Sequence, residues 1–187
     1  MHISTKKIAM LGLLLALTVM LIIFSSFFEM STFFLIALAS FLVGIVINEL
    51  NLSTGLGFYL ASVFLSLVLA PNKLYCLTFA MVAAYLVIVE AVRVSLMKKD
   101  MKKLASLTPV NLNIRGRRKK LWVVKVVVFN LLYLPMLIFF PKLIFPGELS
   151  NLVVIGVWAV GQLVLVAYDF AYQEFVIKHW SRLRKHL

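Results

Sequence analysis

The sequence predicts an all-α integral membrane protein, a bundle of six transmembrane helices with both termini in the cytoplasm. Of its 187 residues, 63% are hydrophobic, and the mean hydropathy is +1.04. Only 14% of the residues are charged, whereas soluble domains carry about a quarter. Lys and Arg outnumber Asp and Glu by 19 to 7, for a net charge of +12. With a single cysteine, Cys76, this composition excludes a soluble enzyme, a disordered chain and a disulfide-stapled secreted module.

Six apolar stretches are candidates for transmembrane helices. A spanning helix needs about 20 apolar residues, because each residue rises about 1.5 Å and the hydrocarbon core is about 30 Å thick. A basic, polar stretch over 97–120 separates the fourth candidate from the fifth and is expected to be a cytoplasmic connector within one membrane domain, 1–187. The third candidate is short, and with the second it also fits a hairpin of one long unit. The predicted spans are 8–24, 33–50, 55–70, 74–96, 121–140 and 149–176.

The basic residues determine the predicted orientation, because Lys and Arg near span ends are retained on the cytoplasmic side. With the N-terminus inside, the inner segments hold the basic residues of 6–7, 93–125 and 178–185. The outer loops hold only Lys73 and Lys142. This split of 17 to 2 predicts a multi-pass protein of the cell membrane, specifically a bacterial plasma membrane.

A dense basic run precedes the fifth predicted span and consists of Arg115, Arg117, Arg118, Lys119 and Lys120. In a soluble protein such a run would indicate nucleic-acid binding. Beside a membrane it is expected to bind the headgroups of anionic lipids, at about 1 kcal/mol per basic residue. We therefore expect anionic lipids as partners and no nucleic acid.

The usual catalytic and metal-binding patterns are missing from the sequence. The three histidines, His2, His179 and His186, lie in the two termini, without a second ligand at metal spacing. There is no glycine-rich phosphate loop, no Gly-x-Ser-x-Gly motif and no paired acidic motif for Mg²⁺. The sequence thus predicts a protein that is not an enzyme and has no metal or cofactor.

A layer of polar residues lies toward the predicted inner face, and ionisable side chains within spans normally face the bundle interior and pair. Glu90 and Arg93 are three residues apart, so they share a helix face and can pair. Lys125 and Asp169 are predicted to lie at similar depth. Two interpretations remain open: structural ion pairs, or contact with a cytoplasmic partner or a proton or ion relay. The layer comprises Asn48, Glu49, Glu90, Arg93, Lys125 and Asp169.

A second, less charged polar layer lies near the predicted outer face. Asn130 and Tyr133 share a face of the fifth span, and Trp158 and Gln162 share a face of the sixth. Pro135 removes a backbone donor and is expected to kink the fifth span. These groups fit either a small-molecule pocket or helix packing with interfacial aromatics. The candidates for ligand contact are Glu29, Asn72, Asn130, Tyr133, Trp158 and Gln162.

The first predicted span carries a strip of small residues, Ala9, Gly12 and Ala16, at three- and four-residue spacing. Such a strip lets another helix approach closely. The spacing fits packing inside the bundle as well as contact with an external partner.

The six-span layout and the opening segment 6–17, KKIAMLGLLLAL, resemble the substrate-binding S components of energy-coupling factor (ECF) transporters. Gly12-x-x-x-Ala16 falls where that family carries an Ala-x-x-x-Ala strip. The resemblance implies that Gly12 and Ala16 meet a coupling transmembrane subunit driven by two cytoplasmic ATPases. It also implies a small-molecule substrate, such as a vitamin or related micronutrient, held near the outer face by the first loop and the last three helices. The family's mechanism is toppling of the whole S component in the membrane.

Two further function classes remain as alternatives. One is a non-catalytic scaffold of the cell envelope resembling the rod-shape membrane protein MreD, which would recruit partners through the basic inner connector. The other is a lipid-modifying enzyme, which would need a polar cluster at the inner headgroup level. Its candidate residues are Glu49, Glu90 and Asp169.

Overall fold

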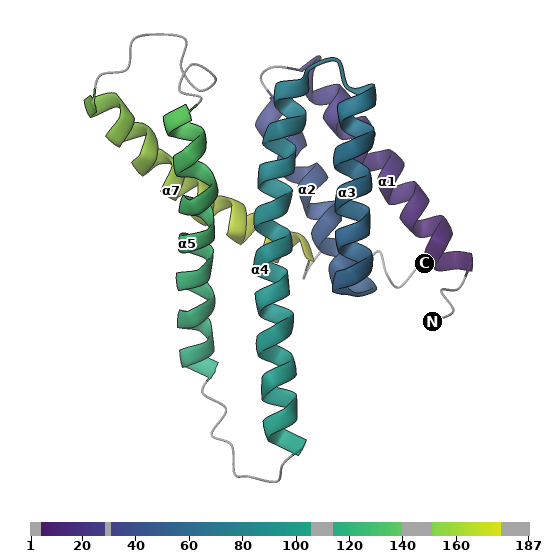
Figure 1. Ribbon diagram of the computed structural model, residues 1–187, viewed down its shortest axis with the longest axis vertical. Coiled ribbons are helices and arrows are strands. Elements are labelled where there is room, and N and C mark those ends of the chain that lie inside the picture. Colours follow the sequence, from purple (N-terminus) through teal and green to yellow (C-terminus); the bar gives the residue numbers. More distant parts are fainter. Residues whose placement is uncertain (1–4, 29–30, 106–113, 140–150, 177–187) are drawn as a thin grey trace. The chain divides into compact units, whose positions relative to one another are not determined.

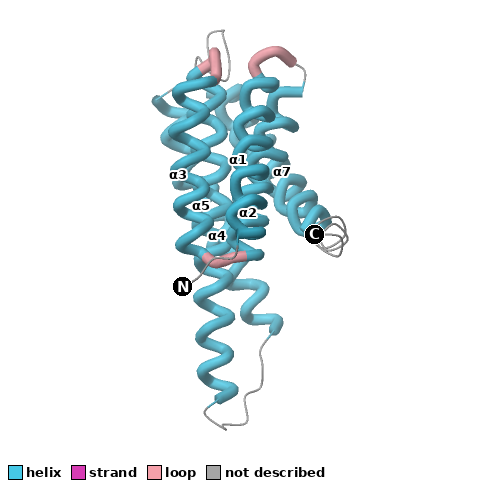
Figure 2. Tube along the Cα trace, turned by 90° about the vertical axis from the view of Figure 1, so that its right-hand side faces the viewer, coloured by secondary structure: helices cyan, strands magenta, loops and turns pink. Residues whose placement is uncertain are grey.

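The computed structural model describes residues 5–28, 31–139 without 106–113, and 151–176, and it describes side chains for 5–28, 31–98, 119–135 and 154–176. The described chain is helical apart from short turns and contains no strand (Figure 2). The predicted all-α class is therefore confirmed. The helices are α1 Thr5–Ser25, α2 Thr32–Glu49, α3 Leu52–Leu69, α4 Lys73–Ala105, α5 Ile114–Phe139 and α7 Asn151–Glu174 (Figure 1).

Five of these helices are long and apolar enough to cross a bilayer. They are α1, α2 and α3 in full, Lys73–Lys98 of α4 and Val154–Glu174 of α7. A multi-pass membrane protein is thus compatible with the structure. The span predicted at 121–140, the total of six spans and the cytoplasmic side of the termini stay predictions.

The chain divides into two compact units, Met1–Lys125 and Val126–Leu187. The boundary falls inside α5, so each unit is described by itself. The first unit holds α1 to α4, and the second holds the later part of α5 together with α7.

In the first unit, α1 to α4 run alternately up and down (Figure 1). All four helices contact one another, and α2 lies at the centre because it makes the most extensive contacts and is the most buried of the four. Its residues Phe41–Ile47 are buried without interruption, which fits a helix that is apolar on all sides. By contrast, α3 presents Leu60, Phe64 and Val68 outward. An outward apolar face of this kind suits lipid rather than water.

Hydroxyl groups in this apolar core bond back to their own helices. The Thr18 Oγ1 donates to the Leu14 carbonyl at 2.8 Å, and the Ser62 Oγ donates to the Phe58 carbonyl at 2.7 Å. Both residues are fully buried. Because the helix itself supplies the acceptors, these hydroxyls are accommodated without a polar partner on another helix.

Short capped turns join α2 to α3 and α3 to α4. Asn51 caps the start of α3, because its Oδ1 accepts a hydrogen bond from the Thr54 amide at 2.8 Å. At the other end, Pro71 follows Ala70, the C-cap of α3, and the Lys73 Nζ donates to the Ala70 carbonyl at 2.9 Å. Helices α2 and α3 are thus separate helices joined by a tight turn.

The close approach of the first turn of α3 to the end of α2 requires a glycine at position 55. A Cβ on Gly55 would lie 2.1 Å from Ile47 Cγ1 and 3.2 Å from Ile47 Cα. We expect Gly55→Ala to lower the free energy of unfolding by about 1 to 3 kcal/mol through overpacking. Thermal unfolding in detergent measures this change. Gly57→Ala on the same helix is the matched control, because its Cβ would meet open space; equal losses for both variants would contradict the prediction.

Helices α4 and α5 extend into the predicted connector. Helix α4 continues from the predicted end at 96 to Ala105, and α5 begins at Ile114 instead of 121. The segment 97–105 consists of Met, Lys, Asp, Leu and Ala, and most of these residue types favour helix. Hydropathy marks where a helix leaves the apolar layer, not where the helix ends. Residues 106–113 of the connector lie outside the described residues.

Candidate functional site

Three polar side chains from α5 and α7 meet within the second unit, and we call Asn130, Trp158 and Gln162 the amide cluster. The indole Nε1 of Trp158 donates a hydrogen bond to Asn130 Oδ1 at 2.9 Å. The Gln162 Nε2 donates to the same oxygen at 3.1 Å. The Asn130 Oδ1 atom of α5 therefore accepts hydrogen bonds from two side chains of α7.

The amide nitrogen of Asn130 is also engaged. Its Nδ2 donates to the Val126 carbonyl on its own helix at 2.8 Å and to Gln162 Oε1 at 3.4 Å. The Asn130 and Gln162 amides thus pair reciprocally, each donating to the oxygen of the other. A carboxamide offers two N–H donors and two acceptor lone pairs, so these contacts use the whole hydrogen-bonding capacity of Asn130.

Tyr133 lies one helical turn from Asn130 and fixes the approach of the two helices. Its hydroxyl donates to the Val157 carbonyl of α7 at 3.1 Å, and its ring stacks on Phe129 with the centroids 5.1 Å apart. The ring lies against Gly161, where a Cβ would come within 2.6 Å of it. Gly161 thus allows α7 to pass close to the ring.

The amide cluster is partly open to its surroundings. Trp158 is 41% exposed, while Asn130 and Gln162 are half-buried. Leu131 and Leu163, which follow the two amides in sequence, are both exposed. The cluster is therefore a polar, uncharged group set between apolar helix surfaces, with one aromatic ring accessible.

The structure brings together four of the six residues predicted to contact a ligand: Asn130, Tyr133, Trp158 and Gln162. Asn72 lies in the first unit, where its Oδ1 accepts from the Leu74 amide at 3.0 Å and caps the start of α4. Glu29 lies outside the described residues. The sequence analysis did not select Gly161 or Phe129. Gly161 follows Val157 by one helical turn, and a glycine in an apolar helix indicates close contact with another helix.

The predicted small-residue strip lies on the outward side of α1 within its unit. Ala9, Gly12 and Ala16 are exposed, and a Cβ on Gly12 would meet nothing within 4 Å. The strip is not used for packing among α1 to α4.

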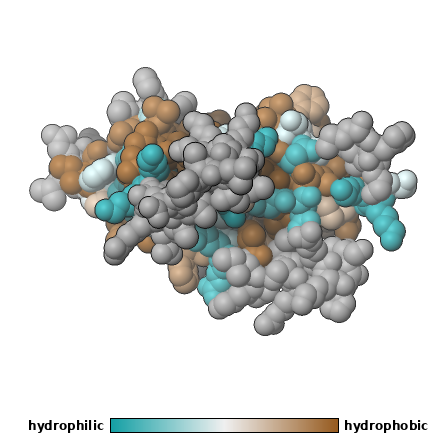
Figure 3. Space-filling view, turned by 90° about the horizontal axis from the view of Figure 1, so that it is seen from below, coloured by the Kyte–Doolittle hydropathy of each residue, from teal (hydrophilic) through white to brown (hydrophobic). Residues whose placement is uncertain are grey.

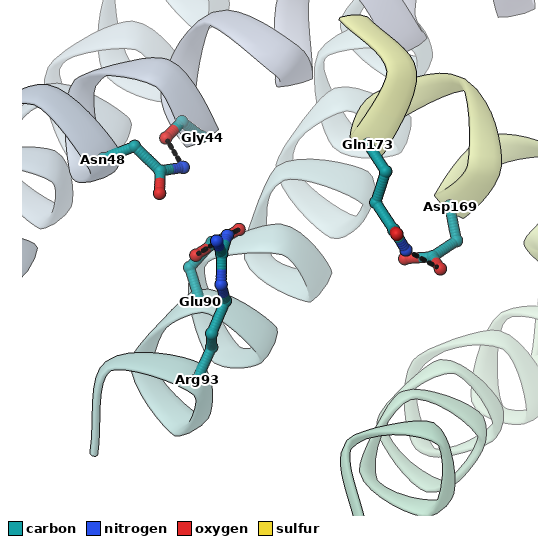
Figure 4. Close-up of polar contacts among 6 residues, drawn as sticks. All are labelled: Gly44, Asn48, Glu90, Arg93, Asp169 and Gln173. Atoms are coloured by element: carbon teal, nitrogen blue, oxygen red, sulfur yellow. Dashed lines mark hydrogen bonds and ion pairs between the residues drawn. The ribbon is translucent and has the colours of Figure 1, made fainter. Parts of the chain in front are cut away.

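The predicted inner-layer pair is confirmed in the first unit. The Arg93 Nη1 lies 3.1 Å from Glu90 Oε1 and 3.3 Å from Oε2. Glu90 is 2% exposed and Arg93 is 46% exposed, so a buried carboxylate is held by a guanidinium that reaches the surface. Asn48, on α2, turns its amide back to the Gly44 carbonyl at 2.8 Å (Figure 4).

Asp169 is held within α7. It is 5% exposed, and its Oδ2 accepts a hydrogen bond from Gln173 Nε2 at 2.7 Å (Figure 4). Lys125 lies over the Trp122 ring of its own helix, 5.7 Å from the centroid. The similar depth of Lys125 and Asp169 stays a prediction.

Hydrophilic residues appear among apolar ones where the molecule is seen from below (Figure 3). The side chains of Lys119 and Lys120 are exposed at the start of α5. Those of Arg115, Arg117 and Arg118 lie outside the side chains described. Among the residues that the structure describes, no group of three His, Cys, Asp or Glu could hold a metal ion.

Comparison of the chain with known protein families, with curated proteins and with solved structures finds no match.

Proposed function

We propose that this protein is a membrane-embedded substrate-binding subunit of an ECF-type importer in a bacterial plasma membrane. Its ligand is a small organic molecule such as a vitamin or related micronutrient, and the subunit has no catalytic step of its own. The observation that carries the proposal is the amide cluster. Residues 130, 158 and 162, selected from the sequence as ligand contacts, share one hydrogen-bonded group.

The composition of the cluster supports binding rather than bond making. Ligand sites are mostly apolar and hold a few convergent polar groups that fix orientation. An indole N–H, two carboxamides and the phenol of Tyr133 supply such groups between apolar helix surfaces. These groups carry no nucleophile activated by a base, which suits capture and release of an intact molecule.

The strip on α1 supports a coupling partner. Gly12 and Ala16 are exposed, and small residues at four-residue spacing allow close helix docking in a membrane. We assign this surface to the coupling transmembrane subunit, which the two ATPases drive. The basic residues 115–120 are assigned to anionic lipids.

Ligand capture is tested with the protein in nanodiscs of its native lipids, by thermal shift against a vitamin and nucleobase panel. We expect one ligand class to raise the unfolding temperature, and Trp158→Ala to lower its affinity about tenfold or more, through lost stacking and hydrogen bonding. Trp122→Ala is the matched control, because Trp122 is a similarly exposed tryptophan of α5 outside the cluster. The proposal fails if no compound shifts the transition and no ATPase-coupled subunit co-purifies.

A second candidate is the envelope scaffold similar to MreD, which the exposed Lys119, Lys120 and Arg93 favour. Replacing the basic residues of 115–120 by glutamine distinguishes the two candidates. A scaffold loses its cellular role and binds no panel ligand, whereas an importer keeps its ligand affinity.

A further inference from the structure

The reciprocal pairing of Asn130 and Gln162 shows which arrangement of hydrogen-bond donor and acceptor is complementary to the Asn130 amide. Gln162 presents an N–H to Asn130 Oδ1 at 3.1 Å and an oxygen to Asn130 Nδ2 at 3.4 Å. A lactam, in which N–H and C=O are neighbours in a ring, presents the same donor and acceptor side by side. The glutamine amide thus occupies the place that a lactam edge would take.

Asn130 is held in place by contacts that do not involve Gln162. The Trp158 indole donates to its oxygen at 2.9 Å, and its nitrogen donates to the Val126 carbonyl at 2.8 Å. Gln162 is half-buried and has a longer flexible side chain, and one of its two bonds to Asn130 is the longest in the cluster. Gln162 is therefore the partner that a ligand displaces, while Asn130 keeps its orientation.

The surroundings of the cluster favour an uncharged ligand. Among the described residues of the second unit, the charged ones are Asp169 and Glu174. Asp169 follows Gln162 by seven residues, which places it about 10 Å farther along the helix, and it is already bonded to Gln173. A charged ligand group at the amides would lose its hydration without gaining an opposite charge nearby.

The exposed indole favours a flat ligand. Trp158 is 41% exposed, and its bond to Asn130 fixes the direction in which the ring lies. Aromatic rings bind planar rings by offset stacking or edge-to-face contact. A planar ring that pairs with Asn130 would have the fixed indole beside it.

We infer that the ligand is an uncharged, planar heteroaromatic compound with a lactam edge, which pairs with the Asn130 amide in place of Gln162 and packs on Trp158. This inference rests on the proposed function and names the substrate class of the same site. In the protein without ligand, the Gln162 amide then takes the place of the lactam, so the hydrogen-bonding groups of Asn130 stay satisfied.

Chemically matched probes test the inference, with affinities measured by tryptophan fluorescence and calorimetry on the full chain in nanodiscs. The lactam probes are quinolin-2(1H)-one, uracil and lumichrome, each paired with a counterpart that lacks every N–H donor: N-methylquinolin-2-one, 1,3-dimethyluracil and 1,3-dimethyl-lumichrome. Quinoline-2-carboxylate is the charged counterpart of the first. We expect the lactams to bind, and N-methylation to weaken binding about tenfold or more.

Two variants separate the roles of the amides. Asn130→Asp keeps the shape but removes the donor, so lactam affinity is expected to fall about tenfold or more; Asn48→Asp is the control amide, since Asn48 lies on α2 in the first unit. Gln162→Met removes the internal competitor and leaves Asn130 intact, so lactam affinity is expected to rise. This increase distinguishes displacement from general damage to the fold.

The outcomes also separate this inference from the proposed function. Binding of quinoline-2-carboxylate or another charged compound, sensitive to Trp158→Ala and without lactam binding, overturns the inference and leaves the proposed function standing. Lactam binding that Asn130→Asp and Gln162→Met leave unchanged also overturns the inference alone. If neither these probes nor the vitamin and nucleobase panel binds, both fail.

Discussion

Glu90→Lys is expected to destabilise the first unit by about 3 to 5 kcal/mol, the range for breaking a buried ion pair. Glu90 is 2% exposed, and its carboxylate lies 3.1 Å from the Arg93 guanidinium. The substitution places a positive charge at the buried position 90 beside Arg93, where that charge has neither water nor an opposite charge to stabilise it. Thermal unfolding in detergent, followed by circular dichroism, measures the loss.

Glu90→Gln is the matched control for this prediction. The glutamine keeps the size of the side chain and an oxygen that can accept from Arg93, so we expect a smaller loss than for lysine. Unfolding temperatures of the two variants that coincide with that of the unmodified protein would show that the pair contributes nothing to stability. The open choice between a structural pair and a relay would then shift toward a functional role.

Gly161→Ala is expected to lower the free energy of unfolding by about 1 to 3 kcal/mol and to disturb the amide cluster. The added Cβ would lie 2.6 Å from Tyr133 Cε1 and 3.0 Å from its hydroxyl oxygen. The ring is held by its stacking on Phe129 and by the bond to the Val157 carbonyl, so it cannot move without losing these contacts. Thermal unfolding measures the loss of stability, and tryptophan fluorescence with Trp122 and Trp180 replaced by phenylalanine, so that Trp158 alone emits, reports the change in the cluster.

Two controls bear on this second prediction. Gly156→Ala adds a methyl group on the same helix where a Cβ meets nothing within 4 Å, so we expect no loss. Combining Gly161→Ala with Tyr133→Ala removes the ring that the methyl group strikes, so the losses are expected to be less than additive. Strictly additive losses would mean that the two residues do not contact each other.

The sequence allowed most of the helices to be placed but not all of their ends. The span predicted at 33–50 corresponds to α2 Thr32–Glu49, because both ends coincide with polar residues. Helix α3 starts at Leu52, three residues ahead of the predicted 55. Hydropathy does not detect a capping residue, although Asn51 before a helix is a known start signal. The extension of α4 to Ala105 was missed for a related reason. The charged residues after position 96 lower the hydropathy, but they still favour a helix.

The sequence predicted that the polar faces of the fifth and sixth spans meet in one site, but not which of their atoms pair. Four-residue spacing places Trp158 and Gln162 on one face of α7, and three-residue spacing does the same for Asn130 and Tyr133 on α5. Spacing within a helix does not determine how far one helix is shifted along another. The reciprocal amide pair depends on that shift, and only the structure shows it. The sequence did contain a signal that Asn72 acts as a helix cap, because it directly precedes α4.

The central position of α2 has a consequence for how the chain is assembled during synthesis. On the proposed membrane topology, transmembrane helices are stable singly and associate afterwards, and α2 enters the bilayer ahead of α3 and α4. Until Lys73–Lys98 has been made, the side of α2 that packs on α4 is covered by lipid or by the insertion machinery. At about 5 to 20 residues per second, this interval lasts for seconds. On that topology, the innermost helix of the finished unit is among the first to meet lipid, and its apolar surface on all sides lets it remain there without a partner.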